Sequence, residues 1–428
     1  MYYINSVKIK GFWGKYTAST HFHEDVNILI GKNGTGKTTF MDLLQAALSV
    51  DLLILSQLEF DEIKIRLKSD KKSRTVSVLK RTPSNSPFEV LNYKIGNKKY
   101  ELLLRDFDTA RYRRYWRTTE VYQKLKLELS KYINLASLSV YRLAYGIQAE
   151  EDLYARRASR DTDKPAVDRY LKELMSRFTS YQLALSEEAN AISSNFQKDV
   201  LVSVLFNEKF DSKLDIGSLN PLSSEQEEGL MRAYRELGVL DEHTKEKIKD
   251  HVEVLNLSLR KVKQYISKKD KPKLEIRDLL PLPLFRRTQH IIDLSLKAES
   301  AKQKKTEPIH KYINMLQEFM DDKRLSIRSK TGEFLITKDE KEINIFDLSS
   351  GEKQLLILLT ETLLQKQQPY IFLADEPEIS LHIEWQAKVV SSIRSINPSS
   401  QVIVATHSPE IASEWSDNII DMEDIVSA

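Results

Sequence analysis

The feature that most constrains this chain is the segment 31–39, Gly-Lys-Asn-Gly-Thr-Gly-Lys-Thr-Thr, which fits the pattern G-x-x-x-x-G-K-[ST]. An apolar run, Val26–Ile30, ends at its first glycine as a buried strand would. Apolar residues at helical spacing follow it, namely Phe40, Leu43, Leu44 and Leu48. A glycine-rich turn between strand and helix lets backbone N–H groups and the helix N-terminus converge on an anion, which predicts a phosphate-binding loop.

The side chains of this loop suit ATP with Mg²⁺. Lys37 would reach the β and γ phosphates, and Thr38 would present its hydroxyl to Mg²⁺. The residues expected to bind ATP here are Asn33, Gly34, Thr35, Gly36, Lys37, Thr38 and Thr39. The alternative is a glycine-rich turn with an incidental lysine, which the flanking strand and helix disfavour.

Two adjacent carboxylates follow a second apolar strand, Ile371–Ala374. Asp375 would hold Mg²⁺, usually through water, and Glu376 would polarise an attacking water. Taken alone, this segment could also be a solvated acidic turn. Beside a phosphate-binding loop, the pair predicts a metal ligand and a catalytic base.

The composition excludes several other classes of protein. A length of 428 residues predicts roughly two to three folding units, and 65 Lys and Arg against 62 Asp and Glu argue against a disordered polyelectrolyte. The lack of cysteine removes disulfides, thiolate nucleophiles and Cys-ligated zinc. No stretch approaches the roughly 18 apolar residues of a membrane span, and the N-terminus alternates like a strand. We therefore expect a cytoplasmic protein with no membrane partner.

An α/β domain interrupted by a helical insertion is the simplest organisation. Alternating stretches at 63–67 and 100–104 predict an antiparallel β layer, with Asn97 in a turn between candidate strands. Helical periodicity dominates from about residue 118, and a hairpin is expected at 325–337. The predicted divisions are an N-terminal lobe, a helical insertion and a C-terminal lobe, at 1–150, 151–322 and 323–428.

Residues 348–354, Leu-Ser-Ser-Gly-Glu-Lys-Gln, precede an apolar helical stretch. On propensity alone this is a capped helix start, with Ser349 or Ser350 as the cap. The segment also resembles the signature motif LSxGE of ABC-type ATPases, in the branch that includes SMC, Rad50 and RecF-like proteins. Because a capped helix N-terminus attracts anions, the two readings are compatible. The resemblance implies that Ser349 and Gly351 bind the γ-phosphate of ATP held by another subunit.

Two further segments resemble motifs of that family, in the family's order. Residues 377–382, Pro-Glu-Ile-Ser-Leu-His, are similar to the D-loop of OLD-like and RecF-like ATPases. Residues 406–409, Thr-His-Ser-Pro, are similar to their switch loop, which implies that His407 contacts the γ-phosphate. A lone histidine at a strand end is more often structural. Four ordered motifs nevertheless imply an ABC-type ATPase head, an α/β fold with an antiparallel β layer.

The family's glutamine loop is less distinct. Gln148, after the candidate strand Leu138–Leu143, is the nucleotide contact that the resemblance favours, and the alternative is an ordinary polar residue at the start of the insertion. Phe12 and Trp13 resemble the position next to adenine, although aromatic residues there are equally expected in a core.

The resemblance also has a consequence for assembly. In the family, the phosphate loop of one chain and the signature motif of another enclose the same nucleotide when two chains pack head to tail. The chain is therefore expected to form at least a homodimer with composite ATP sites. ATP would join the subunits, and hydrolysis would loosen them.

The insertion is expected to be too short and too interrupted by proline for the coiled-coil arms of SMC or Rad50. It is more similar to that of OLD-type and related defence ATPases. OLD-type nucleases continue into a Toprim nuclease domain, whereas here only 21 residues follow His407, with late acids at Asp417, Asp421, Glu423 and Asp424. The arrangement resembles the AriA family, the ATPase components of PARIS anti-phage systems, which implies a separate Toprim nuclease as partner and a phage protein as trigger.

A basic and aromatic segment is a candidate contact for such a trigger. Residues 111–117 read Arg-Tyr-Arg-Arg-Tyr-Trp-Arg and could bind phosphates, stack on bases, or receive an acidic protein. The alternative is a solvated basic helix or internal ion pairs. The lysine-rich run 261–273 is expected to be solvated.

These observations predict an ATP-driven conformational switch that controls a separate effector nuclease in anti-phage defence. The first alternative is a DNA-binding ATPase of the RecF type in repair or recombination. The second is the energy subunit of a transporter, which the helical insertion disfavours.

Overall fold

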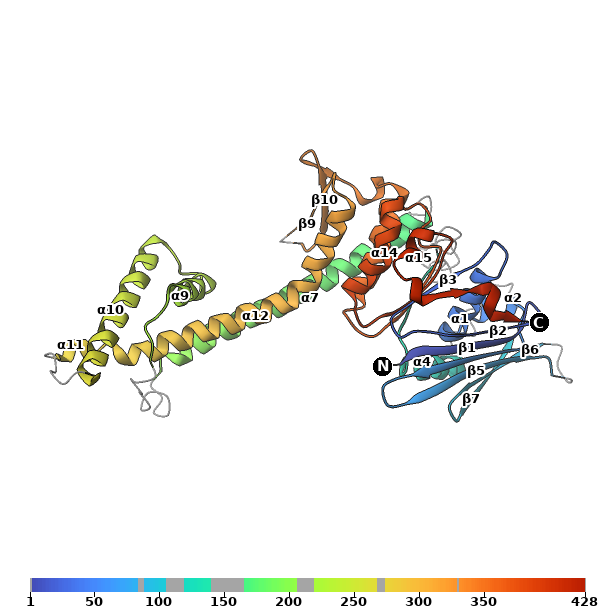
Figure 1. Ribbon diagram of the computed structural model, residues 1–428, viewed down its shortest axis with the longest axis horizontal. Helices are drawn as coiled ribbons and strands as arrows, with labels where there is room; N and C mark the ends of the chain where they lie inside the picture. The colour runs from blue at the N-terminus through green and yellow to red at the C-terminus, as the bar shows by residue number, and fades with distance from the viewer. Residues whose placement is uncertain are drawn as a thin grey trace. The chain divides into compact units, whose positions relative to one another are not determined.

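The computed structural model describes residues 2–83, 88–104, 119–139, 165–205, 219–267, 274–328 and 331–427 (Figure 1). The chain divides into two compact units. One comprises Met1–Tyr181 with Ile309–Ala428, and the other comprises Gln182–Pro308. The divisions expected at 150 and 322 stay predictions.

A five-stranded parallel sheet forms the centre of the first unit. Its order is β14 (Ile419–Asp421), β3 (Val26–Ile30), β13 (Gln401–Ala405), β12 (Ile371–Asp375) and β8 (Leu135–Ser139). All neighbouring pairs are parallel, so the carboxyl ends of β3, β12 and β13 lie at one edge. The predicted strands at 26–30, 371–374 and 402–405 are confirmed, and β8 begins three residues before the strand expected at 138.

A seven-stranded antiparallel sheet forms the second layer. Its order is β15 (Val426–Ser427), β2 (Tyr16–His21), β1 (Tyr3–Phe12), β4 (Glu62–Lys68), β5 (Ser73–Arg81), β6 (Glu89–Ile95) and β7 (Lys98–Leu104). In β4 every second side chain is buried, as the sequence alternation predicts. Asn97 lies in the turn between β6 and β7, and the antiparallel layer is confirmed.

Helix α1 (Lys37–Ser49) packs between these layers because its apolar face is broad. Phe40, Leu43 and Leu44 are fully buried in a core that includes Ile9 and Ile63 of the antiparallel sheet. The same core includes Leu373 of β12. The position of α1, and therefore of the loop before it, is fixed by both sheets.

Shorter elements complete the first unit. Its other described helices are α2 (Leu52–Gln57), α4 (Glu120–Ser130), α13 (Ser350–Leu364), α14 (Ile383–Ile396), α15 (Pro409–Ser413) and α16 (Met422–Ile425), with 3-10 turns at Ile345–Asp347 and Ser416–Asn418. The predicted hairpin is confirmed as β9 (Arg324–Ile327) and β10 (Phe334–Lys338), to which β11 (Lys341–Ile343) adds a third strand. The α/β fold with an antiparallel layer and a helical insertion is therefore confirmed.

The insertion is built from helices α7 (Ala166–Ser203), α9 (Ser224–Glu236), α10 (Glu242–Ser267), α11 (Ile276–Leu279) and α12 (Leu282–Phe319). The second unit has its own core, which includes Leu255, Leu259 and Phe285. Helices α7 and α12 each run for 38 residues, longer than the proline content suggested. Pro283 falls in the first turn of α12, where a missing N–H costs little, and Pro308 is accommodated inside the helix. None of the described helices combines the length and apolar character needed to cross a membrane.

Candidate nucleotide-binding site

The phosphate loop joins β3 to α1 in a conformation that requires glycine. Gly34 and Gly36 have φ values of 83° and 95°, in the left-handed region. A Cβ atom on Gly36 would lie 2.8 Å from Cζ2 of Trp13 and 2.9 Å from Cε1 of Phe12. The loop therefore passes directly over these two rings, and larger residues are excluded.

Lys37 is held inside this loop. It is only 6% exposed, and its Nζ donates hydrogen bonds to the carbonyl oxygens of Gly31 at 2.7 Å and Lys32 at 3.3 Å. Burial lowers the pKa of Lys37, and four nearby carboxylates oppose that shift. Those carboxylates belong to Glu376, Asp375, Glu378 and Asp421. The side chain is thus a buried cation placed among acids at the edge of the sheet.

Asp375 has the features expected of a magnesium ligand. It is 6% exposed, accepts a hydrogen bond from the side chain of Thr38, and has a buried Oδ1 with no hydrogen-bond partner among the residues that the structure describes. Burial raises its pKa to about 6, against the opposing effect of the Thr38 hydrogen bond. A buried carboxylate oxygen without a partner is costly, and a cation would satisfy it.

The donor set fits Mg²⁺ bound together with a nucleotide. Among the described residues, no group of three or more acidic or histidine side chains could hold a metal. An ion here would instead use Thr38, Asp375 and phosphate oxygens, which is the arrangement that Mg²⁺ commonly adopts in nucleotide sites.

Glu376 turns the chain sharply at the end of β12. Its φ is 48°, in the left-handed region that residues other than glycine rarely adopt. Its N–H donates to the carbonyl of Ala405 at 2.8 Å. The side chain is half-buried and close enough to Lys37 to oppose the fall in its pKa. This backbone conformation places the predicted catalytic carboxylate beside the phosphate loop.

Glu378 organises the switch loop, a role that the sequence analysis did not assign. Its Oε1 accepts hydrogen bonds from the hydroxyl of Thr406 at 2.6 Å and from the backbone N–H of His407 at 2.8 Å. Its Oε2 is buried and has no partner in the described ranges of the chain. The side chain of His407 is exposed. Glu378 therefore fixes the backbone from which His407 projects.

Asp421 is a second residue whose position the sequence did not reveal. It ends β14, and its Oδ1 would lie 3.6 Å from a Cβ atom on Gly31. The side chain caps α16 by accepting from the N–H of Glu423 at 2.9 Å. Segment 421–423 thus supports the start of the phosphate loop, where Lys32 also pairs with Glu423 at 3.2 Å.

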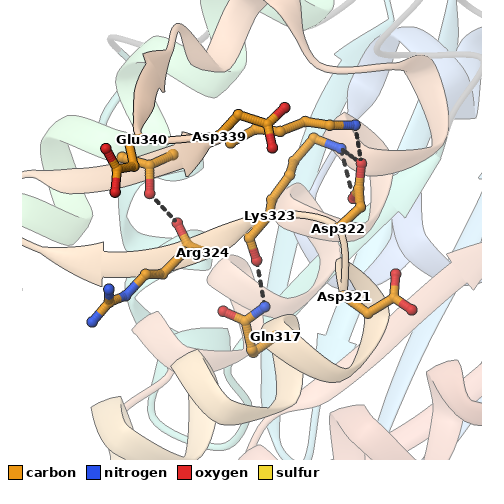
Figure 2. Close-up of a pocket in the computed structure, with 9 residues that line it drawn as sticks. Gln317, Asp321, Asp322, Lys323, Arg324, Asp339 and Glu340 are labelled. Carbon is orange, nitrogen blue, oxygen red and sulfur yellow. Dashed lines mark hydrogen bonds and ion pairs between the residues drawn. The ribbon is translucent and has the colours of Figure 1, made fainter.

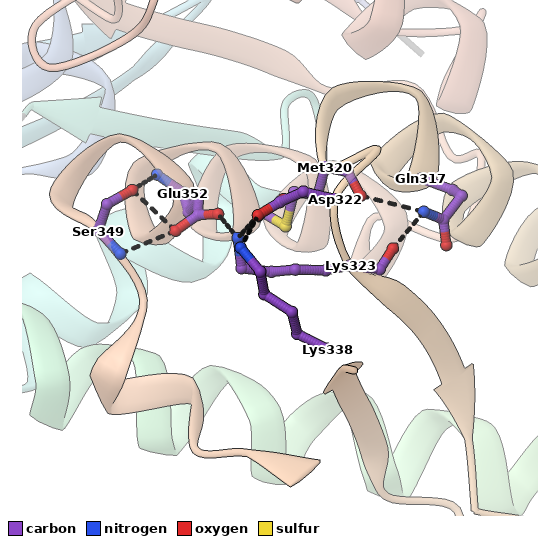
Figure 3. A network of polar contacts seen from close by, with 7 residues as sticks. All are labelled: Gln317, Met320, Asp322, Lys323, Lys338, Ser349 and Glu352. Carbon is purple, nitrogen blue, oxygen red and sulfur yellow. Dashed lines mark hydrogen bonds and ion pairs between the residues drawn. The ribbon is translucent and has the colours of Figure 1, made fainter. Parts of the chain in front are cut away.

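The residues predicted to form the signature motif lie at the start of α13. Ser349 caps this helix, and its N–H and Oγ both lie 2.8 Å from Oε2 of Glu352, while the N–H of Glu352 donates back to Ser349 Oγ at 3.3 Å (Figure 3). This is a reciprocal capping box. The capped helix start is confirmed, and its role in binding phosphate stays a prediction.

Gly351 brings this helix start against the segment predicted to be the D-loop. A Cβ atom on Gly351 would lie 2.3 Å from the carbonyl oxygen of Ser380 and 3.8 Å from Cα of Leu381. Ser380 itself has a φ of 71°. The absence of a side chain at position 351 is what permits this backbone approach.

Gly351→Ala is therefore expected to disturb both segments at once. Because the obstructing atom belongs to the backbone, relief requires a shift of the helix start or of residues 380–381, at a cost of about 1–3 kcal/mol. We expect a lower melting temperature and a loss of ATPase activity of at least about tenfold. Ser350→Ala, at an exposed neighbouring position, is the matched control. Unchanged stability and turnover in Gly351→Ala would show that the close approach is unimportant.

Some of the remaining predicted residues lie in the described part of the chain, and others do not. Phe12 is fully buried and stacks on Trp13 at 4.8 Å, and Trp13 is 37% exposed beside the phosphate loop. Phe12 is thus core, and Trp13 lies where a base could reach it. Gln148 and the basic segment 111–117 lie outside the described residues. Asn33, Thr35 and Thr39 lie on the loop or the first turn of α1, with Asn33 exposed.

The parallel sheet, the lysine-bearing loop after β3 and the carboxylates after β12 define a P-loop ATPase domain. The chain belongs to the AAA ATPase domain family, whose model matches residues 1–412. This membership supports ATP binding by the chain.

Two curated relatives match shorter stretches. The Retron Vc95 probable ATPase of Vibrio cholerae serotype O1 biovar El Tor is 36% identical over 85 residues, which cover 17% of this chain and 16% of that protein. Septu protein PtuA of Bacillus thuringiensis is 32% identical over 99 residues, which cover 20% of this chain and 25% of that protein. The matches therefore span no more than a quarter of either relative.

Solved structures of Smc head domains also align. A Pyrococcus furiosus Smc head with an extended coiled coil, bound to the C-terminal domain of ScpA, is 16% identical and covers 98% of this chain and 93% of that chain, with a TM-score of 0.42. A Pyrococcus yayanosii Smc head with a coiled coil and joint is 14% identical. The match covers 98% of this chain and 95% of that chain, with a TM-score of 0.40.

Proposed function

We propose that this chain binds and hydrolyses Mg-ATP at the loop 31–39. The observation that carries the proposal is the buried Oδ1 of Asp375, which has no hydrogen-bond partner within the described part of the chain, on a side chain that lies near Thr38 and Lys37. When bound, Mg²⁺ would neutralise charge on the β and γ phosphates. Lys37 would leave the carbonyls of the loop for the phosphate oxygens, and the N–H groups of the loop would orient the triphosphate.

In this proposal, Glu376 accepts a proton from the attacking water and His407 contacts the γ-phosphate. Glu378 supports this step by holding the backbone at 406–407 in place. Ser349 and Gly351 of a second copy would complete each site, so that ATP joins two chains and hydrolysis releases them. Gln148 remains the proposed glutamine-loop contact.

We further propose that this cycle is a switch that controls a separate effector in the cytoplasm. The resemblance to the AriA family of PARIS anti-phage systems suggests a Toprim nuclease as effector, and the local matches to a retron ATPase and to Septu protein PtuA support a defence role. The trigger would be an acidic phage protein or nucleic acid that meets residues 111–117. A DNA-repair ATPase is the second candidate and would require stimulation by DNA alone.

Mixing two inactive variants tests the composite site. Lys37→Ala removes the phosphate cation, and Ser349→Arg blocks the opposite half of the site. If two chains share each nucleotide, a mixed dimer has one site with both halves intact. The two variants are co-expressed with different tags, and mixed dimers are purified through both tags. We expect these mixed dimers to regain about a quarter to a half of the wild-type ATPase activity per dimer.

The control is a mixture of two Lys37→Ala chains with different tags, which should stay inactive. Mixed assemblies that form but show no activity above either parent would exclude independent composite sites. ATPase stimulation by duplex DNA, measured in parallel without any phage protein, would favour the repair ATPase.

A further inference from the structure

The predicted phosphate-binding serine is engaged by a carboxylate. Glu352 Oε2 lies 2.8 Å from both the Oγ and the backbone N of Ser349. A carboxylate has no proton to give, so the serine hydroxyl donates to it and cannot donate to a phosphate at the same time. The negative charge of Glu352 would also repel an incoming phosphate at this helix start.

The other oxygen of Glu352 is bound by a lysine from a distant part of the chain. Lys323 Nζ lies 2.6 Å from Glu352 Oε1, and each of these two side chains is only 11% exposed (Figure 3). Burial alone would raise the pKa of Glu352, yet hydrogen bonds from Lys323 and Ser349 hold it below its usual value. The pair is therefore shielded from water, and removal of one partner would leave the other as a buried, uncompensated charge.

Lys323 is itself held firmly where α12 runs into β9. The side-chain amide of Gln317, in the last turn of α12, donates to the carbonyls of Met320 and Lys323 and accepts from the N–H of Leu325. Asp322 binds both Lys323 at 2.9 Å and Lys338 of β10 at 2.7 Å. The lysine that meets Glu352 is thus anchored to a helix end and to the three-stranded sheet.

A pocket of about 430 Å³ is lined by Gln317, Asp322, Lys323, Lys338 and neighbouring charged residues (Figure 2). Substitutions of Lys323 can therefore change charge without overpacking the surroundings.

We propose that Lys323 is a positioning residue for Ser349: by binding Oε1 of Glu352 it offsets the charge of the carboxylate, so that the Ser349 hydroxyl can pass its hydrogen bond from Oε2 to an incoming phosphate while the backbone N–H of Ser349 still holds the carboxylate. This inference rests on the proposed role of Ser349 in a composite ATP site. A purely structural capping box would need Glu352 alone, because glutamate or glutamine at this position caps a helix without help.

The two interpretations differ in how the variants affect ATP-dependent association of folded chains. In Lys323→Met the charge of Glu352 is left uncompensated at the phosphate contact, so assembly around ATP should weaken. Adding Glu352→Gln removes that charge while the glutamine still caps the helix, so assembly should recover. If Lys323 only stabilised the fold, the second substitution would restore the melting temperature, and association measured at a temperature where every chain is folded would not differ between the variants.

The measurement is Mg-ATP-dependent self-association by sedimentation, in a Glu376→Gln background that preserves ATP. We expect Lys323→Met to weaken association about tenfold, with ATP affinity of the separate chains unchanged within about twofold. The double variant should return to within about threefold of the parent. Lys323→Arg should match the parent, and Lys338→Met, which loses an Asp322 contact but none to Glu352, is the matched control.

Melting curves accompany each variant, and Lys323→Gln replaces Lys323→Met if the latter does not fold. Association in Lys323→Met equal to the parent, or no recovery in the double variant, overturns the role of Lys323. Ser349→Arg separates this from a failure of the proposed function. If Ser349→Arg also associates normally, the proposal of a composite site is wrong. Loss of association in Ser349→Arg supports that proposal, whatever the result for Lys323.

Discussion

Lys37→Ala is expected to abolish ATP binding. We expect the affinity for ATP to fall at least about a hundredfold, which corresponds to a loss of about 2.7 kcal/mol of binding free energy. Lys37 is the one lysine or arginine that is buried in the described ranges of the chain, and four carboxylates surround it. Without its charge, Asp375, Glu376 and Asp421 would face a triphosphate with no protein cation among them, and repulsion would add to the lost contact.

Isothermal calorimetry with Mg-ATP measures this effect directly. Lys32→Ala is the matched control, because that neighbouring lysine belongs to the same loop but pairs with Glu423 on the surface. We expect its affinity to stay within about fivefold of wild type. Equal affinities in Lys37→Ala and wild type would place ATP elsewhere on the chain.

At the candidate site, the sequence predicted the local structure of those segments whose geometry is set by neighbouring residues. The phosphate loop needs a strand, a helix and glycines within about fifteen residues, and each leaves its own pattern in the sequence. The turn after β12 and the cap at Ser349 were likewise visible, because a strand end and an N-cap are short-range features.

Residues that act through distant contacts could not be predicted in this way. Glu378 reaches Thr406, and Lys323 reaches Glu352, only because strands and helices bring these positions together. In the sequence, Asp421 is one of several acidic residues near the C-terminus. Only the pairing of β14 with β3 brings it beside the phosphate loop. Charge at a single position gives no periodicity, so only the tertiary arrangement reveals its partner.

The long helices of the insertion were underestimated for a related reason. Proline content predicts an interrupted region, yet helix interruption depends on where the proline falls within the helix. At the first turn of α12, Pro283 loses no hydrogen bond, and the helix continues through Pro308. The pattern therefore indicated the helices but not their lengths.

Glu376→Gln is expected to separate ATP binding from hydrolysis. The amide has almost the same shape, so the left-handed turn at φ 48° and the bond from its N–H to Ala405 should persist. An amide cannot accept the proton of an attacking water, and general-base catalysis contributes about 10²–10⁴-fold to a rate. We therefore expect turnover to fall at least a hundredfold while Mg-ATP affinity stays within about threefold.

The same substitution should trap whatever assembly ATP creates. Sedimentation with Mg-ATP should show a larger species that persists for hours in Glu376→Gln and decays in wild type as ATP is consumed. Glu423→Gln, at an exposed carboxylate whose partner is Lys32, is the matched control and should turn over normally. Because Glu376 and Glu378 both lie near Lys37, normal turnover in Glu376→Gln would move the catalytic role to Glu378, whose buried Oε2 has no partner within the described structure.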